Sequence, residues 1–133
     1  MLDSFPVNPV LPAQDGDRAR AFYRDVLGLK LVSGPADDPM MFTAGLGTSI
    51  VLTELPDRTP PPYPVVSFLV EGIEALVEQL KARGATFEQL PGSTSFAGQA
   101  GARHGEVMDF GVVKSAFLKD TEGNLLALNE LVG

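Results

Sequence analysis

The sequence contains no cysteine and no tryptophan, and its one histidine is His104. Without cysteine, the chain forms no disulfide, has no thiolate nucleophile and holds no metal through sulfur. A single histidine also excludes a metal site that is built on a pair of imidazoles. The candidate chemistry is therefore limited to carboxylates, amides, hydroxyls, the amine and guanidinium groups of Lys and Arg, and one imidazole.

Positive charge and long apolar runs are also scarce. The 10 Lys and Arg residues face 17 Asp and Glu residues, for a net charge of −7, and a nucleic-acid partner is not expected because it requires a basic face. No apolar run approaches the length of about 18 residues that spans a bilayer. The first ten residues, MLDSFPVNPV, lack the basic and apolar regions of a signal peptide. We therefore expect a cytoplasmic protein with no membrane association.

A repeat is the most informative feature that is present. The segment Gly47–Leu55 (GTSIVLTEL) returns as Gly123–Leu131 (GNLLALNEL). Upstream of each copy lies a segment with helical apolar spacing that ends in glycine, Asp15–Gly28 and Glu71–Gly84. Self-similarity of this kind indicates a duplicated unit. The sequence predicts an α+β fold made of two successive βαβββ modules.

The limits of the two modules follow from composition. Module one covers about residues 1–56, a proline-rich linker covers 57–64, and module two covers about 65–133. We expect Asp15 or Asp17 to cap the first helix, and Gly28 and Gly84 to end the two helices with positive φ. The segment Pro91–Gly105 is rich in glycine and serine, which predicts a loop.

Two motifs carry a resemblance to a known family. The run Phe22–Gly28 (FYRDVLG), preceded by Asp15, resembles the first-helix signature of the vicinal oxygen chelate superfamily. The run Phe117–Leu126 (FLKDTEGNLL) is similar to the family's closing turn, with Thr121 where proline is usual. This superfamily includes glyoxalase I, extradiol dioxygenases, and fosfomycin-resistance and bleomycin-binding proteins. The resemblance implies one domain of residues 1–133, in which two curled mixed sheets enclose a shared cavity with the helices outside.

The resemblance also implies where metal ligands would stand, because metal-dependent members take one from the first and one from the last strand of each module. The corresponding residues are Asn8, Val51, Val65 and Ala127. Valine and alanine have no ligand atom, so we expect no family metal site and no other cofactor. Glu54 and Glu130 lie three residues further along the last strands, and strand alternation predicts that both face away from the cavity.

Alternation from these positions, with neighbours from the second module, gives a set of candidate residues for a ligand-binding cavity. They are Asn8, Ser49, Val51, Val65, Ser67, His104, Met108, Phe117, Ala127 and Asn129. Such a lining is mainly apolar with a few amide and hydroxyl groups, which is typical of small-molecule pockets. The alternatives are that many of these residues fill the core and that His104 is solvated in its loop.

The predicted function is that of a glyoxalase/bleomycin-resistance type protein that binds a small organic ligand without a metal, as a sequestering or resistance-type binder. The alternative is a lyase or dioxygenase-like enzyme that has a non-standard metal site or uses metal-free acid–base chemistry. The residues do not decide whether a reaction is catalysed, because one scaffold serves many functions. We also expect a homodimer, since half-open sheets leave unpaired edges.

Overall fold

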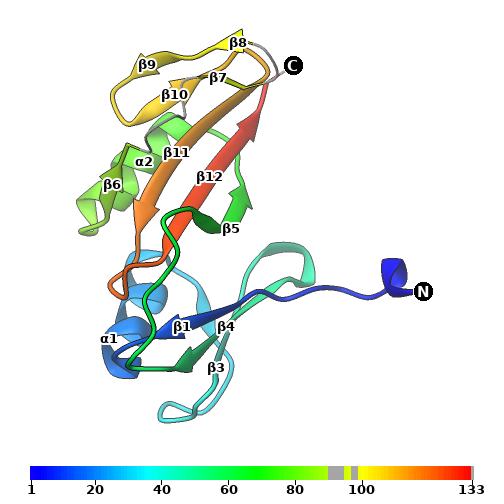
Figure 1. Cartoon of the computed structure of the whole chain (residues 1–133), viewed down its shortest axis with the longest axis vertical. Helices are drawn as coiled ribbons and strands as arrows, with labels where there is room; N and C mark the ends of the chain where they lie inside the picture. Colours follow the sequence, from blue (N-terminus) through cyan, green and yellow to red (C-terminus); the bar gives the residue numbers. More distant parts are fainter. Residues whose placement is uncertain (90–94, 97–98, 133) are drawn as a thin grey trace. The chain divides into compact units, whose positions relative to one another are not determined.

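The computed structural model describes residues 1–89, 95–96 and 99–132, which form two compact units. The first unit comprises residues 1–60 together with the turn Thr121–Asn124, and the second comprises the rest of the chain. Each unit contains one α-helix and one main sheet (Figure 1). Among the described residues, neither helix has the length and apolar character that crossing a bilayer requires.

The first unit contains a four-stranded sheet in the order β1-β4-β3-β2. β1 runs parallel to β4, and the other pairs are antiparallel. The strands are β1 (Val10–Ala13), β2 (Lys30–Leu31), β3 (Met40–Thr43) and β4 (Ser49–Glu54). Its helix α1 (Gly16–Ala21) continues into a π-helical turn, Phe22–Val26, and short 3-10 turns lie at Leu2–Ser4 and Gly45–Gly47.

Strand alternation gives this sheet one buried face and one open face. The buried face and the helix share a core of Leu11, Ala13, Ala19, Tyr23, Met40, Phe42, Ile50 and Leu52. The open face carries apolar side chains that remain in contact with solvent, with Val10 63% and Met41 38% exposed.

The local signals that start and end the first helix act as the sequence predicts. The Asp15 carboxylate accepts a hydrogen bond from the Arg18 amide at 3.1 Å, which confirms the cap. The Leu27 amide donates to the Phe22 carbonyl, five residues back, and Gly28 then leaves the helix with φ 73°. Gly84 follows α2 with φ 101°. The prediction that these two glycines are left-handed is confirmed.

The second unit contains a larger sheet in the order β5-β12-β11-β10-β9, with β6 pairing to the far end of β11. Its strands are β5 (Pro64–Leu69), β6 (Thr86–Glu88), β9 (Ala102–His104), β10 (Val107–Asp109), β11 (Val113–Lys119) and β12 (Leu125–Leu131). β5 runs parallel to β12, as β1 does to β4. A separate ribbon pairs β7 (Ser95–Phe96) with β8 (Gln99–Ala100).

The two units therefore repeat one topology, and the α+β class with a duplicated strand–helix–strands unit is confirmed. The prediction of a loop over residues 91–105 was wrong for its described part, because β7, β8 and β9 lie there. All three residues of β9 are exposed. An edge strand with no buried face shows no apolar alternation, so the sequence contains no signal for it.

Helix α2 (Ile73–Ala82) covers one face of the second sheet and packs on β10, β11 and β12 (Figure 1). Lys114 of β11 forms an ion pair with Glu74 of this helix, 2.8 Å between Nζ and Oε1. The Glu130 carboxylate of β12 accepts hydrogen bonds from the Gly72 and Ile73 amides at the helix start. The even-numbered residues of β11 and β12 thus face the helix, and the odd-numbered residues face away from it.

Replacement of Gly84 by alanine is expected to lower the free energy of unfolding by about 1 kcal/mol. The reason is that the left-handed backbone conformation is unfavourable for a residue with a Cβ atom. Nothing lies within 4 Å of the added methyl group, so no steric cost contributes. Gly45→Ala is the matched control, since its site is equally open but its φ is not in the left-handed region. Urea unfolding of both variants measures the difference. Equal losses in the two variants would contradict the assignment.

Candidate functional site

A groove of about 760 Å³ lies on the face of the second sheet that is opposite to α2. Its volume is within the range of small-molecule pockets. The lining residues come from β5, β11 and β12 and from the segment before β11, and none of them is charged. They are Pro64, Ser67, Leu69, Phe110, Val112, Val113, Ser115, Phe117, Ala127, Asn129 and Leu131.

A backbone irregularity in β5 changes which residues of this strand reach the groove. Leu125 pairs with Pro64 and Leu126 pairs with Val66, so Val65 is an extra residue on its strand. A bulge of this kind interrupts the regular alternation of side chains. Pro64 consequently joins Ser67 and Leu69 in the lining, and Val65 does not.

A row of three hydrogen-bonded polar side chains crosses the apolar groove. The Ser115 hydroxyl of β11 donates to Asn129 Oδ1 of β12 at 2.6 Å. Asn129 Nδ2 donates in turn to Ser67 Oγ of β5 at 2.5 Å. The polar row therefore links three adjacent strands, and the flanking positions Ala127 and Phe117 are apolar.

Charged side chains lie next to the groove on the side of Ser115. A small pocket of about 10 Å³ shares Ser115 and Phe117 with the groove and is otherwise bounded by Glu88, Gln89, Arg103, Glu106 and Met108. That volume suits no more than about one water molecule. Glu106 is hydrogen-bonded to Lys81 at 2.7 Å, which lowers the pKa of Glu106 and raises the pKa of Lys81. Both groups are therefore charged, and each neutralises the other.

The structure distributes the sequence-predicted candidates over both units. Ser67, Phe117, Ala127 and Asn129 line the groove, and Met108 bounds the small pocket beside it. The remaining candidates lie elsewhere. In the second unit, Val65 is in the bulge and His104 is exposed on β9. In the first unit, Ser49 and Val51 are half-buried on β4, and Asn8 is exposed before β1.

Sequence reasoning missed Ser115, the residue that completes the polar row. Its signal was available, because it lies two residues before Phe117 on a predicted strand and alternation places both on one face. Phe110 is 4% exposed and also belongs to the lining of the groove.

The side chains near the family-type ligand positions do not fit a divalent ion. Val51 is paired across the sheet with Val10, and Ala127 is paired with Ser67. The four expected positions Asn8, Val51, Val65 and Ala127 offer one amide oxygen, and the partners Val10 and Ser67 add one hydroxyl. A divalent ion needs several nitrogen or carboxylate ligands. Over residues 1–89, 95–96 and 99–132, no three His, Asp or Glu side chains are grouped so that they could hold a metal.

The twin carboxylates Glu54 and Glu130 lie at the helix starts. Glu130 accepts from the Gly72 and Ile73 amides, and a methyl group added to Gly16 would lie 3.3 Å from Glu54 Oε2. Negative charge is favourable at a helix N-terminus. Neither residue lines the groove, and the predicted orientation of Glu130 away from that face is confirmed.

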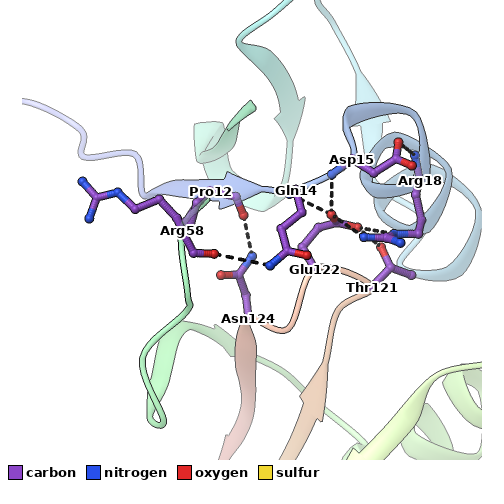
Figure 2. A network of polar contacts seen from close by, with 8 residues as sticks. All are labelled: Pro12, Gln14, Asp15, Arg18, Arg58, Thr121, Glu122 and Asn124. Carbon is purple, nitrogen blue, oxygen red and sulfur yellow. Dashed lines mark hydrogen bonds and ion pairs between the residues drawn. The ribbon is translucent and has the colours of Figure 1, made fainter. Parts of the chain in front are cut away.

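The second carboxylate network belongs to the first unit and is centred on Glu122, whose side chain is fully buried (Figure 2). It accepts hydrogen bonds from the Gln14 and Asp15 amides at 2.9 and 2.8 Å and from Arg18 Nε at 2.9 Å. Thr121 adds a hydrogen bond at 2.7 Å. The turn Thr121–Asn124 is thereby fixed to the start of α1.

Opposing effects determine the protonation of Glu122. Burial alone would raise the pKa of its carboxyl group, but the hydrogen bonds from Arg18, the Asp15 amide and Thr121 outweigh burial. The pKa of Glu122 consequently lies below its ordinary value of 4.5. Asn124, the last residue of the turn, donates from Nδ2 to the Pro12 carbonyl at 3.0 Å. These motif residues therefore stabilise the fold and lie outside the groove.

Comparison with known proteins identifies the fold. The sequence model of the Glyoxalase/Bleomycin resistance protein/Dioxygenase superfamily matches residues 7–128 of the chain. No curated protein matches the chain.

Solved structures with the same fold include proteins with different activities. Lactoylglutathione lyase from Agrobacterium tumefaciens has a TM-score of 0.65 at 20% identity, over 96% of this chain and 93% of the other. TnmS3, an antibiotic binding protein from Streptomyces sp. CB03234, has a TM-score of 0.68 at 20% identity, over 99% of both chains. The fosfomycin resistance protein FosX from Listeria monocytogenes has a TM-score of 0.70 at 15% identity, over 97% and 94%. Identities at this level establish the fold alone.

Replacement of Glu122 by glutamine is expected to lower the free energy of unfolding by about 2 kcal/mol at pH 7. Glutamine lacks the negative charge of the carboxylate, and its side-chain N–H group would face the N–H donors of Arg18. The folded-state pKa of Glu122 is depressed, so its stabilisation is present above about pH 4.5 and is lost as the pH falls through the folded-state value. The difference between wild type and Glu122→Gln should therefore shrink below pH 4.5.

Urea unfolding at a series of pH values, followed by circular dichroism, measures this difference. Glu71→Gln serves as the control, because Glu71 is exposed and such a substitution changes stability by less than about 0.5 kcal/mol. A Glu122→Gln protein as stable as wild type at pH 7, or a difference that grows in acid, would contradict the account.

Proposed function

Because the chain belongs to the Glyoxalase/Bleomycin resistance protein/Dioxygenase superfamily, we propose that it binds a small uncharged organic molecule in the groove of its second unit. The proposed role is that of a sequestering or resistance-type binder in the cytoplasm. The observation that carries the proposal is a ligand-sized groove whose lining is apolar except for one polar row. TnmS3, a binder of antibiotics by its description, has the same fold.

The lining also favours an uncharged ligand. In the described part of the chain, no Lys, Arg, His, Asp or Glu is among the groove residues, so a bound anion or cation would have no counter-charge from them. Transfer of an unpaired charge from water into apolar surroundings is strongly unfavourable. An apolar body, by contrast, gains free energy from contact with residues such as Phe117 and Val113.

The enzyme alternative receives support from the likeness to lactoylglutathione lyase. General acid–base chemistry, however, needs a titratable group within hydrogen-bond reach of the substrate. Among the residues that the structure describes, no titratable side chain lines the groove, and the family-type ligand positions carry Asn8, Val51, Val65 and Ala127. We therefore place binding without a metal ahead of catalysis.

A homodimer is part of the proposal. In the described residues, β1 and β2 are the edge strands of the first main sheet, and β5, β6 and β9 have unpaired edges in the second. Edge strands have free backbone donors and acceptors that favour association. The open face of the first sheet also exposes Val10 and Met41, and exposed apolar side chains of this kind mark contact surfaces.

Two fluorescent probes with one anilinonaphthalene skeleton test the preference for uncharged ligands. N-phenyl-1-naphthylamine is neutral, and 1-anilinonaphthalene-8-sulfonate carries a sulfonate. We expect the neutral probe to bind at least about tenfold more tightly, which is about 1.4 kcal/mol of binding free energy. Fluorescence titration gives both affinities. Equal binding, or tighter binding of the sulfonate, would contradict the proposal.

The position of the site is tested by filling the groove. Ala127 lies on its floor, and Ala127→Phe should occupy the space and weaken the neutral probe by more than about tenfold. Thr86→Phe, on β6 of the same sheet and outside the lining, is the control and should bind as wild type does. A filled groove that binds the probe normally would place the site elsewhere.

Sedimentation equilibrium at micromolar concentration tests the homodimer. The expected species has twice the chain mass of 14.1 kDa. A single species at 14.1 kDa would remove the dimer from the proposal and leave the groove prediction intact.

A further inference from the structure

The polar row Ser67–Asn129–Ser115 is directional. On the basis of the proposed function, we infer that it selects ligands that carry a hydrogen-bond acceptor beside a donor, such as a lactam. The acceptor of the ligand lies at the Ser67 end of the row, and the donor lies at the Ser115 end.

The direction follows from an inventory of protons. The Ser115 proton is given to Asn129 Oδ1, so Ser115 Oγ has only lone pairs for a ligand. Ser67 Oγ accepts from Asn129 Nδ2, and its own proton is not used in any hydrogen bond among the described residues. Asn129 itself keeps one N–H and one oxygen lone pair. Donors therefore face the β5 end, and acceptors face the β11 end.

Burial makes the row selective. Ser115 is only 6% exposed and Asn129 is half-buried, while Ser67 is exposed at the groove side of β5. A ligand that covers the row removes the remaining water from these atoms. A buried polar atom without a partner weakens binding, so a ligand that lacks either the donor or the acceptor is disfavoured.

The row is particular to the second unit. Alignment of Gly47–Leu55 with Gly123–Leu131 makes Thr53 the counterpart of Asn129, and Val10 pairs with Val51 as Ser67 pairs with Ala127. Thr53 has no side-chain amide and Val10 has no hydroxyl, so neither can take the place of its counterpart in the polar row. The first unit therefore supplies a matched control position in the same repeat.

The experiment compares two bicyclic probes, 2-quinolinone and 1-methyl-2-quinolinone, by displacement of N-phenyl-1-naphthylamine. Both probes carry the carbonyl acceptor, and only the first carries the adjacent N–H donor. Wild type is expected to bind 2-quinolinone about tenfold more tightly, as one satisfied donor at a partly buried site predicts. Asn129→Leu should abolish this preference, and Thr53→Val should leave it unchanged.

The serine variants test the direction. Ser67→Ala removes the donor that meets the carbonyl, so it should weaken both quinolinones alike. Ser115→Ala removes the acceptor, so it should weaken 2-quinolinone and spare the methylated probe. The reverse pattern for the two serines would overturn the direction, and circular dichroism establishes that each variant is folded. Asn129→Thr, which inserts the twin residue, is the second variant in case Asn129→Leu does not fold.

The outcomes separate this inference from the function on which it rests. Binding of the naphthylamine by wild type with no preference between the quinolinones would overturn the donor–acceptor inference and leave the proposed function in place. Failure of wild type to bind the naphthylamine or either quinolinone would overturn both.

Discussion

The alternation of side chains along β12 is the constraint on which the groove and the core of the second unit both depend. Leu126 and Leu128 are buried on the α2 side, whereas Ala127 and Asn129 are directed to the groove. A shift of one residue would place leucines in the groove and remove Asn129 from the polar row. β12 is held in register by parallel pairing with β5 and antiparallel pairing with β11. Core packing therefore also positions the polar row.

The carboxylates that stand out in the sequence serve the fold. Glu130 satisfies the free amides at the start of α2, and Glu122 satisfies those before α1 while it pairs with Arg18. These hydrogen-bonded carboxylates, of which Glu122 is buried and Glu130 half-buried, stabilise the helix starts, and neither lines the groove. This explains why the family-like closing motif identifies the scaffold and says little about the reaction or ligand.

Much of the fold and part of the site could be predicted from the sequence, because repeats and periodic patterns report regular structure. The duplication, both helices and the left-handed Gly28 and Gly84 follow from such patterns, as does the common face of Ala127 and Asn129. The bulge at Val65 has no periodic signal, and neither does β9, which is exposed throughout. The burial of Glu122 was also beyond prediction, since glutamate is rarely buried unless tertiary partners compensate it.

The central claim is that the second-unit groove is the binding site for an uncharged organic molecule. A crystal structure of the protein grown with N-phenyl-1-naphthylamine tests it most directly. The account predicts electron density for the probe over Ala127, in contact with Phe117 and beside Asn129. Density for the probe on another surface, with the groove filled by side chains or by a segment of a second chain, would contradict it.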